Sequence, residues 1–412
     1  MREPISGGNC YDWLTAEKRS TMKPFECQNC GRLLHFENTR CENCGLALGY
    51  LPAQETVTAL IDPSNEGADH ASWGALAEPT GRYRFCANAA HGTCNWLVDD
   101  GTEELYCGAC RHNRTIPDLS IPDNLARWYR IEAAKHRLFY TLLKLHLPLQ
   151  TRVEDPENGL AFDFVSSDAL PLHGEGPVMT GHANGVITIS LAEADDAERE
   201  RIRSVMGEPY RTLLGHFRHE IAHYYWDRLI AGTPWLDTFR ETFGDERADY
   251  GAALQRHYQE GPPSDWPDAF VSAYASAHPW EDFAETWAHY FHMIDTLETA
   301  RGFGLSVRPR VANPDDQTMV VDFDPHRAEM SRIIDAWLPL TVAINAVNRS
   351  MGLADLYPFV LTPSVIVKLT FVHTCIHTGI HAPSRSGRGQ GDADLKAIVA
   401  GLRRDLGTPN PV

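Results

Sequence analysis

The spacing of apolar residues is most regular between residues 209 and 230, where it follows the period of an α-helix. Pro209 suits the first position of this predicted helix, and Gly232 is expected to end it. One face of the helix carries the apolar side chains Tyr210, Leu214, Phe217 and Ile221. A helix of this kind packs its apolar face on a core and turns its polar face towards a cleft or solvent.

The same spacing predicts further helices on both sides of this segment. They span residues 121–147, 192–206 and 244–261, a stretch from Pro279 to Leu297, and most of 324–380. Strand-like alternation lies between Leu160 and Leu191, where Asn184-Gly185 is a hairpin turn signal. Residues 51–82 have weak periodicity and are interpreted as connecting structure or a strand pair. The pattern predicts an α+β protein that is mainly helical with a small sheet.

The chain has 412 residues, which is long enough for two or three domains. We predict a cysteine-rich region, a connecting helix, a domain built around the 209–230 helix, a helical C-terminal part of that domain, and a flexible tail. These parts are assigned to residues 1–118, 119–150, 151–300, 301–382 and 383–412. The tail is expected to be flexible because it lacks apolar anchors.

Acidic residues exceed basic residues by 55 to 37, which gives a net charge of −18 at pH 7. This charge opposes attraction to nucleic acid or to an anionic membrane, so neither partner is expected, although residues 111–115 form a small basic patch. The N-terminus lacks the apolar segment of a signal peptide, and no apolar run reaches the roughly 18 residues that span a bilayer. We expect a soluble, cytoplasmic protein.

Two C-x-x-C-G motifs stand close together near the N-terminus. They consist of Cys27 with Cys30 and Cys41 with Cys44. The following glycine permits a positive φ, so that the backbone turns and its amide groups point at the thiolates. A redox C-x-x-C would occur singly beside a βαβ pattern, whereas two motifs in tandem indicate a structural four-cysteine zinc site.

A second cysteine group follows with looser spacing in its first half. It contains Cys86, Cys94, Cys107 and Cys110. We predict a second structural zinc ion here, with His91 in place of one cysteine as the variant left open. Cys10 and Cys375 remain, and we interpret each as a small side chain without a role. Clustered cysteines of this kind also favour a reducing compartment.

The polar face of the 209–230 helix contains the motif H-E-x-x-H, formed by His219, Glu220 and His223. Positions i and i+4 lie on one helix face, so the two imidazoles can bind one metal ion, with Glu220 as general base. This is the signature of zincin peptidases. The extended motif with a third histidine is excluded, because Trp226 and Leu229 occupy the positions of its glycine and histidine.

A carboxylate from the helix that begins near Pro279 is the expected third ligand. Glu281 and Glu285 lie one turn apart on its polar face. We assign Glu281 as the ligand and Glu285 as the acceptor that orients a histidine. The reverse assignment remains open because spacing alone does not separate them, and Asp249 is a weaker alternative.

Tyr274 and His278 precede Glu281 by about two turns and one turn, and either could stabilise a developing oxyanion. A buried aromatic or a helix cap is an equally good interpretation of each residue. Three further histidines share a face with the expected ligands, but a lone helical histidine usually has another role, so they are left out of the ligand set. These are His216, His289 and His292.

Several blocks agree in order with one family. They are CQNCG, CENCG, CGACRHNRTIPDL, TGHANGVITISLAEADD, EPYRTLLGHFRHEIAHYYWDRL, FGDERADYGAAL and SAHPWEDFAETWAHY. Up to about His381 the chain resembles bacterial zinc-binding metallopeptidases that carry an N-terminal zinc ribbon. The resemblance implies a gluzincin-like fold with peptidase activity. The block E-D-F-A is also similar to the ligand segment of the lethal factor type of metalloprotease, which favours Glu281 and, two turns earlier, Tyr274.

The function predicted from these features is zinc-dependent hydrolysis of peptide bonds in a protein or peptide substrate. Three zinc ions are expected, one catalytic and two structural. The N-terminal zinc modules would recruit a substrate or a protein partner. The alternative is a zinc-stabilised adaptor with an inactive site, against which the presence of Glu220 argues, since a structural site has no use for a base beside the metal.

Overall fold

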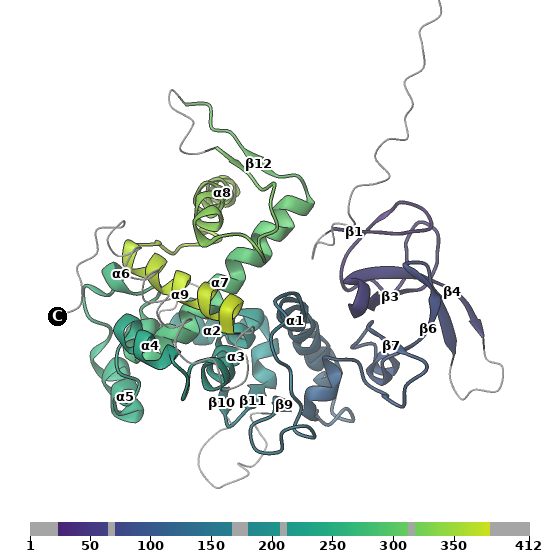
Figure 1. The fold of residues 1–412 in the computed structure, drawn as a ribbon, viewed down its shortest axis with the longest axis horizontal. Coiled ribbons are helices and arrows are strands. Elements are labelled where there is room, and N and C mark those ends of the chain that lie inside the picture. Colours follow the sequence, from purple (N-terminus) through teal and green to yellow (C-terminus); the bar gives the residue numbers. More distant parts are fainter. Residues whose placement is uncertain (1–23, 65–70, 167–179, 207–211, 312–317, 380–412) are drawn as a thin grey trace, which may run out of the picture.

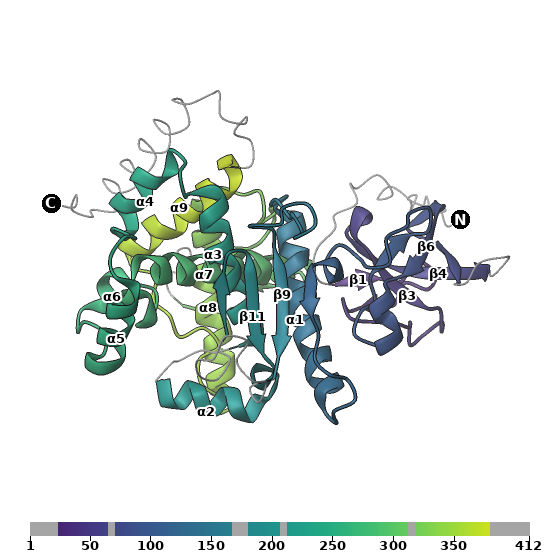
Figure 2. The same cartoon turned by 90° about the horizontal axis from the view of Figure 1, so that it is seen from below.

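The computed structural model describes residues 24–64, 71–166, 180–206, 212–311 and 318–379. The predictions for Cys10, for the helix start at Pro209 and for the tail 383–412 fall outside these residues. Within them, an N-terminal region of short strands is followed by a mostly helical part with small sheets (Figures 1 and 2). The predicted α+β class with an N-terminal zinc-ribbon region is therefore confirmed.

The N-terminal region contains a two-stranded and a five-stranded antiparallel sheet. The strands are β1 (Phe25–Glu26) with β2 (Leu33–Leu34), and β3 (Leu48–Leu51), β4 (Thr56–Ser64), β5 (Ser72–Ala75), β6 (Glu78–Phe85) and β7 (Leu97–Asp99). Residues 51–82, interpreted from sequence as at most a strand pair, thus supply most of the larger sheet. Each of these strands pairs with its neighbour along the chain, and a bridge from Tyr50 to Trp96 brings β7 back to β3. The register shifts within the β4–β5 and β5–β6 pairs, which weakens the alternation expected of a regular strand.

A four-stranded sheet beyond the N-terminal region has the strand order β10-β11-β9-β8. Its strands are β8 (Asn113–Thr115), β9 (Ala161–Val165), β10 (Gly181–Ala183) and β11 (Val186–Ser190). β10 and β11 form the predicted hairpin, and Asn184 and Gly185 both have positive φ, at 47° and 80°, as a tight hairpin turn requires. β10 is an edge strand, while β8 arrives from the cysteine-rich region and pairs in parallel with β9.

Helices make up most of the rest of this part. They are α1 (Asn124–Lys144), α2 (Asp196–Met206), α3 (Leu213–Leu229), α4 (Trp235–Phe243), α5 (Tyr250–Glu260), α6 (Trp266–Ala269), α7 (Pro279–Gly302), α8 (Met330–Ser350) and α9 (Pro363–Gly379). Helix α3 contacts β10 of the sheet. A short hairpin of β12 (Ser306–Val307) and β13 (Met319–Val320) precedes α8. Helix α4 was not predicted, and α5 begins later than expected. In the described parts, no helix is long and apolar enough to cross a membrane.

Helix α1 lies between the cysteine-rich region and the rest of the helical part (Figures 1 and 2). On one side Tyr140 of α1 packs against Phe36 and Tyr50, with ring centroids 5.7 and 6.2 Å apart. On the other side α1 contacts α3. Most buried apolar residues of both regions form one continuous cluster, so α1 joins the regions through a shared core, while a small second cluster lies in the five-stranded sheet.

Candidate active site and metal centres

Helix α3 positions His219 and His223. Its N-cap is Thr212, whose hydroxyl accepts a hydrogen bond from the backbone N–H of Gly215 at 3.0 Å. Of the predicted apolar face, Phe217 and Ile221 are fully buried and Leu214 is half-buried against the core, while Tyr210 lies outside the described residues. The polar face of α3 is therefore turned away from the core. The imidazole rings of His219 and His223 lie on this face with their centroids 5.1 Å apart.

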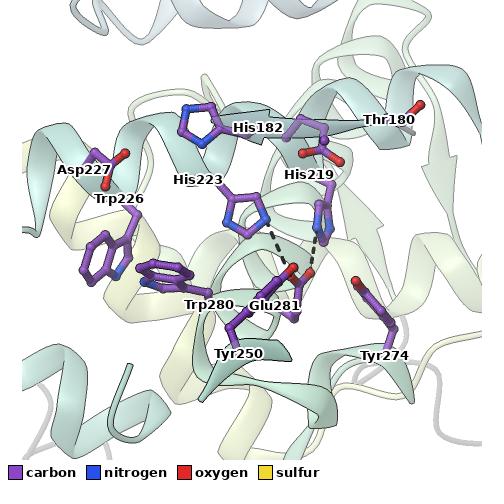
Figure 3. Close-up of a pocket in the computed structure, with 12 residues that line it drawn as sticks. Thr180, His182, His219, His223, Trp226, Asp227, Tyr250, Tyr274, Trp280 and Glu281 are labelled. Atoms are coloured by element: carbon purple, nitrogen blue, oxygen red, sulfur yellow. Dashed lines mark hydrogen bonds and ion pairs between the residues drawn. The ribbon is translucent and has the colours of Figure 1, made fainter. Parts of the chain in front are cut away.

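Helix α7 brings Glu281 to these histidines. Oε2 of Glu281 is 2.9 Å from Nε2 of His219, and Oε1 is 3.9 Å from Nε2 of His223 (Figure 3). The three candidate ligand atoms lie within 4.8 Å of one another. With zinc–ligand bonds of about 2.1 Å, two ligands of a tetrahedral ion are about 3.4 Å apart, and the observed separations bracket that value.

Glu285 contacts His219 from the other side of the ring. Its Oε1 lies 2.8 Å from Nδ1 of His219, and its Oε2 accepts a hydrogen bond from the hydroxyl of Ser272 at 2.6 Å. Glu285 does not line the pocket that contains His219 and Glu281. The geometry therefore gives the two glutamates different positions, which spacing along the helix could not do.

The surroundings of His219 fit a bound cation. Nδ1 of His219 donates to the Glu285 carboxylate, so a neutral ring would present the lone pair of Nε2 to the Glu281 carboxylate. Burial by itself lowers the pKa of His219, but hydrogen bonds and charge from both glutamates raise this pKa well above its usual value. Nε2 of His219 holds a second proton strongly because the Glu281 carboxylate lies beside it. A divalent metal ion at the same position would be attracted by the same charge.

The pKa values of the other two groups indicate forms that can bind a metal. Burial would raise the pKa of Glu281, but the hydrogen bond from His219 and the charge of His223 lower it to about 2. Burial lowers the pKa of His223 to about 4, against the opposing charge of Glu281. At neutral pH the carboxylate is ionised and the His223 ring is neutral, as metal coordination requires.

Tyr250 was missed from the sequence. Its hydroxyl donates a hydrogen bond to Oε1 of Glu281 at 2.7 Å, so it orients the carboxylate. The neighbouring Asp249, considered as a ligand, instead caps α5 by accepting a hydrogen bond from the N–H of Ala252 at 3.0 Å. The block that contains Asp249 had been singled out, but a tyrosine next to it carries no metal-ligand signal.

The candidate ligands His219, His223 and Glu281 line a pocket of about 240 Å³. It is lined by Thr180, Gly181, His182, His219, Glu220, His223, Trp226, Asp227, Tyr250, Tyr274, Trp280 and Glu281. The edge strand β10 forms one wall, and two indole rings 5.3 Å apart form part of another (Figure 3). His182 and the two tryptophans were not predicted as site residues. The sequence predicted the strand β10 but none of its side chains as part of the site.

The two residues predicted to stabilise an oxyanion are placed differently. Tyr274 lines the pocket, with its ring centroid 6.0 Å from that of His219. His278 does not line it, since its Nδ1 accepts from the N–H of Trp280 and its Nε2 donates to the carbonyl of Ala248, both at 3.1 Å. His278 is the N-cap of α7, which agrees with the helix-cap interpretation left open from the sequence.

The histidines left out of the ligand set all have contacts away from the pocket. His216 lies 3.1 Å from Glu193, the Nδ1 of His289 lies 2.7 Å from the hydroxyl of Tyr357, and His292 contacts Arg218. Leu229, at the position of a third histidine in the extended motif, is buried in the core.

The first cysteine group has the geometry of a tetrahedral zinc site. Sγ of Cys27 and Cys44 are 3.7 Å apart, and those of Cys30 and Cys41 are 3.6 Å apart. Zinc–sulfur bonds of about 2.3 Å place two sulfur ligands about 3.8 Å apart. The glycines that follow, Gly31 and Gly45, have the expected positive φ of 71° and 76°.

The second cysteine group is buried more deeply. The sulfur atoms of Cys86, Cys94, Cys107 and Cys110 lie within 4.8 Å of one another. The variant with His91 is not favoured, because that side chain is exposed and is absent from the group. A different histidine, His136 of α1, contacts two of the sulfur atoms, and no spacing signal connected it to the cysteines.

Two protein families match this chain, and the two matched segments meet at the start of α1. Residues 24–121 match a family described as a zinc-ribbon domain, and residues 124–375 match one described as "Putative zinc-binding metallo-peptidase". Uncharacterized proteins of Mycobacterium bovis and Mycobacterium tuberculosis are each 44% identical over 356 residues, which cover 86% of this chain and 95% of the relative. No solved structure matches the chain.

Proposed function

Because the chain belongs to the family described as "Putative zinc-binding metallo-peptidase", we propose that it hydrolyses peptide bonds in a protein or peptide substrate with the help of one zinc ion. The observation that carries this proposal is the group of His219, His223 and Glu281, which lies in a pocket together with Glu220. These three residues would hold the ion. When bound, zinc supplies an activated water and polarises the scissile carbonyl.

Glu220 is the proposed general base. It follows His219 directly on α3 and lines the same pocket, so its carboxylate would be available to an attacking water there. It would accept the proton of that water and then give it to the leaving amine. Glu285 would keep the hydrogen of His219 on Nδ1, and Tyr250 would hold the Glu281 carboxylate in place.

Tyr274 is the proposed donor to the developing oxyanion. Burial raises the pKa of its hydroxyl above the usual value, and the charge of Glu281 adds to this, so the hydroxyl keeps its hydrogen at neutral pH. The hydroxyl of Tyr250 already donates to Glu281, which leaves Tyr274 as the better-placed tyrosine for this role.

The edge strand β10 is the proposed docking site for an extended substrate. Gly181 and His182 of β10 line the pocket, and an edge strand offers backbone hydrogen bonds that do not depend on substrate sequence. The two cysteine groups would hold structural zinc, and the zinc-ribbon region would recruit a substrate or a protein partner. Free thiols in zinc-type groups favour a reducing compartment, so we place the protein in the cytoplasm.

The competing function is a zinc-stabilised adaptor without catalysis. The two are separated by incubating the purified protein and its Glu220→Gln variant with a proteome-derived peptide library and counting new termini by mass spectrometry. We expect cleavage by the native protein, none by the variant, and about three zinc ions per chain in both. Full zinc content without any cleavage by the native protein would support the adaptor instead.

A further inference from the structure

The second cysteine group is not enclosed by the zinc-ribbon region alone. Helix α1, which belongs to the peptidase segment, places three buried polar side chains against it, Glu132, Lys135 and His136. Nε2 of His136 lies 3.3 Å from Sγ of Cys94 and 3.5 Å from Sγ of Cys110. A polar residue of one segment is thus in direct contact with the predicted metal centre of the other.

The orientation of the His136 ring is fixed from its far side. Nδ1 lies 2.7 Å from the backbone oxygen of Glu132, and a carbonyl can only accept, so Nδ1 donates. Nε2 then faces the sulfur pair of Cys94 and Cys110, and a ring that donates from both nitrogens is a positively charged imidazolium. Separations of 3.3 and 3.5 Å are ordinary for an N–H group that donates to sulfur.

The four sulfur atoms already satisfy a tetrahedral ion without His136. Sγ of Cys94 and Cys107 are 3.8 Å apart, which matches the spacing of about 3.8 Å expected for two sulfur ligands of one zinc ion. His136 approaches this group from the side of Cys94 and Cys110, so it suits a hydrogen-bond donor better than a fifth ligand.

The negative charge of the site also favours a hydrogen-bond donor beside the sulfur atoms. Four thiolates around one Zn²⁺ leave two negative charges, and all four cysteines are buried. The charge of Lys135 is opposed by Glu132, whose carboxylate lies 2.9 Å from Nζ. Backbone N–H groups donate to the sulfur atoms of Cys86, Cys94 and Cys107, whereas the Glu132 carboxylate lies 3.7 Å from Sγ of Cys110. A positively charged His136 in contact with Cys94 and Cys110 would offset this negative charge.

We propose that His136 of α1 donates a hydrogen bond from Nε2 to the zinc-bound thiolates of Cys94 and Cys110, so that the second structural zinc ion fastens the zinc-ribbon region to the peptidase domain. The site is then a centre at the junction of the two regions. This role is independent of peptide hydrolysis and goes beyond the proposed function.

Helix α1 also connects the second cysteine group to the candidate active site. Thr141, five residues after His136, donates to the carboxylate of Asp295 on α7 at 2.8 Å. Asp295 also pairs with Arg218, the residue before His219 on α3. Zinc in the second cysteine group would thus fix the helix on which part of the α3–α7 arrangement rests.

Two matched polar variants test the proposal. In His136→Gln the amide nitrogen comes close to the position of Nε2 and can still reach the thiolates, whereas in His136→Asn the shorter side chain reaches only the position of Nδ1. We expect His136→Asn to release one zinc ion per chain to a chromophoric chelator about 10- to 100-fold faster than the native chain, and His136→Gln to stay close to native. The exposed His91→Ala is the control and should not change release.

Equal release from the native chain and both variants would overturn the proposal. The kind of contact is tested by X-ray absorption on the full chain with His219→Ala and His223→Ala, which should retain two zinc ions. A hydrogen bond predicts about four sulfur neighbours per zinc, whereas a mean of about 3.5 with a nitrogen shell would make His136 a ligand and contradict the proposed role. Neither readout depends on catalysis.

Discussion

Nδ1 of His219 lies 2.8 Å from Oε1 of Glu285, and this contact decides which nitrogen of the ring faces the pocket. Glu285 approaches the ring from the side opposite the candidate metal position, while Glu281 lies on the metal side. Two glutamates one turn apart on one helix therefore lie on opposite sides of the ring of His219, and we propose different roles for them, Glu281 as ligand and Glu285 as the acceptor that orients the ring.

Separate replacement of the two glutamates should distinguish these roles. We expect Glu281→Ala to lose one zinc ion per chain, because a ligand is removed. Glu285→Ala should retain three ions at saturation but bind one of them about 10- to 100-fold more weakly, because the histidine is no longer oriented. Metal analysis after dialysis against zinc buffers measures both. The opposite pattern would make Glu285 the ligand.

Separate replacement of Tyr274 and Tyr250 should distinguish an effect on turnover from an effect on zinc binding. We expect Tyr274→Phe to lower kcat by about 10²- to 10³-fold with unchanged zinc content, since an oxyanion donor is lost. Tyr250→Phe should weaken zinc binding, because its hydroxyl donates to Glu281 at 2.7 Å. Steady-state kinetics and zinc titration of both variants check this prediction. A loss of zinc from Tyr274→Phe would contradict the role given to that residue.

The features predicted well from the sequence are those specified locally. The Asn184-Gly185 turn, the start of α7 at Pro279 and the buried face of α3 each depend on residues a few positions apart. Family membership and the zinc-ribbon region were predicted correctly as well. The role of Glu281 stays a prediction, which its distances to the two histidines support.

The features missed depend on contacts between distant segments. Tyr250 reaches Glu281 across 31 positions, and His136 reaches Cys94 across 42. Neither residue carries a spacing signal, because its partner lies on another element. His278 shows the converse, since its position before a helix is equally suited to a cap and to catalysis, and its contacts with Trp280 and Ala248 are those of a cap.

The stability of the protein should depend on pH through His326. Nε2 of this buried residue is 3.4 Å from Asp295, and Nδ1 is 3.5 Å from Asp324. Burial lowers the pKa of His326, but the two carboxylates outweigh it and raise the pKa from 6.5 to about 9. The folded state therefore holds this proton more tightly, and the stabilisation is full below pH 6.5 and is lost as the pH rises to about 9.

Over that range we expect this group to lower the free energy of unfolding by up to about 3 kcal/mol. Urea denaturation at a series of pH values measures the slope, and His326→Gln should remove this part of it. An identical slope in the variant and the native protein would show that His326 does not titrate in this way.

The N-cap of α3 gives a prediction for stability alone. Thr212→Ala removes the acceptor for the N–H of Gly215 and should cost about 1 kcal/mol, whereas Thr212→Ser keeps the hydroxyl and should cost much less. Thermal or urea unfolding of the two variants provides the comparison. Equal losses would assign the effect to the methyl group of threonine rather than to the cap.

The pairing of β8 with β9 has a consequence for how this chain can be divided. β8 comes from the cysteine-rich region, yet it completes the sheet whose opposite edge, β10, lines the pocket. A fragment that began after residue 121 would expose the backbone of β9 as an open edge and uncover the aromatic side of α1, a combination that promotes self-association. We therefore expect the two matched segments to fold as one unit, and the C-terminal segment to self-associate when it is produced alone.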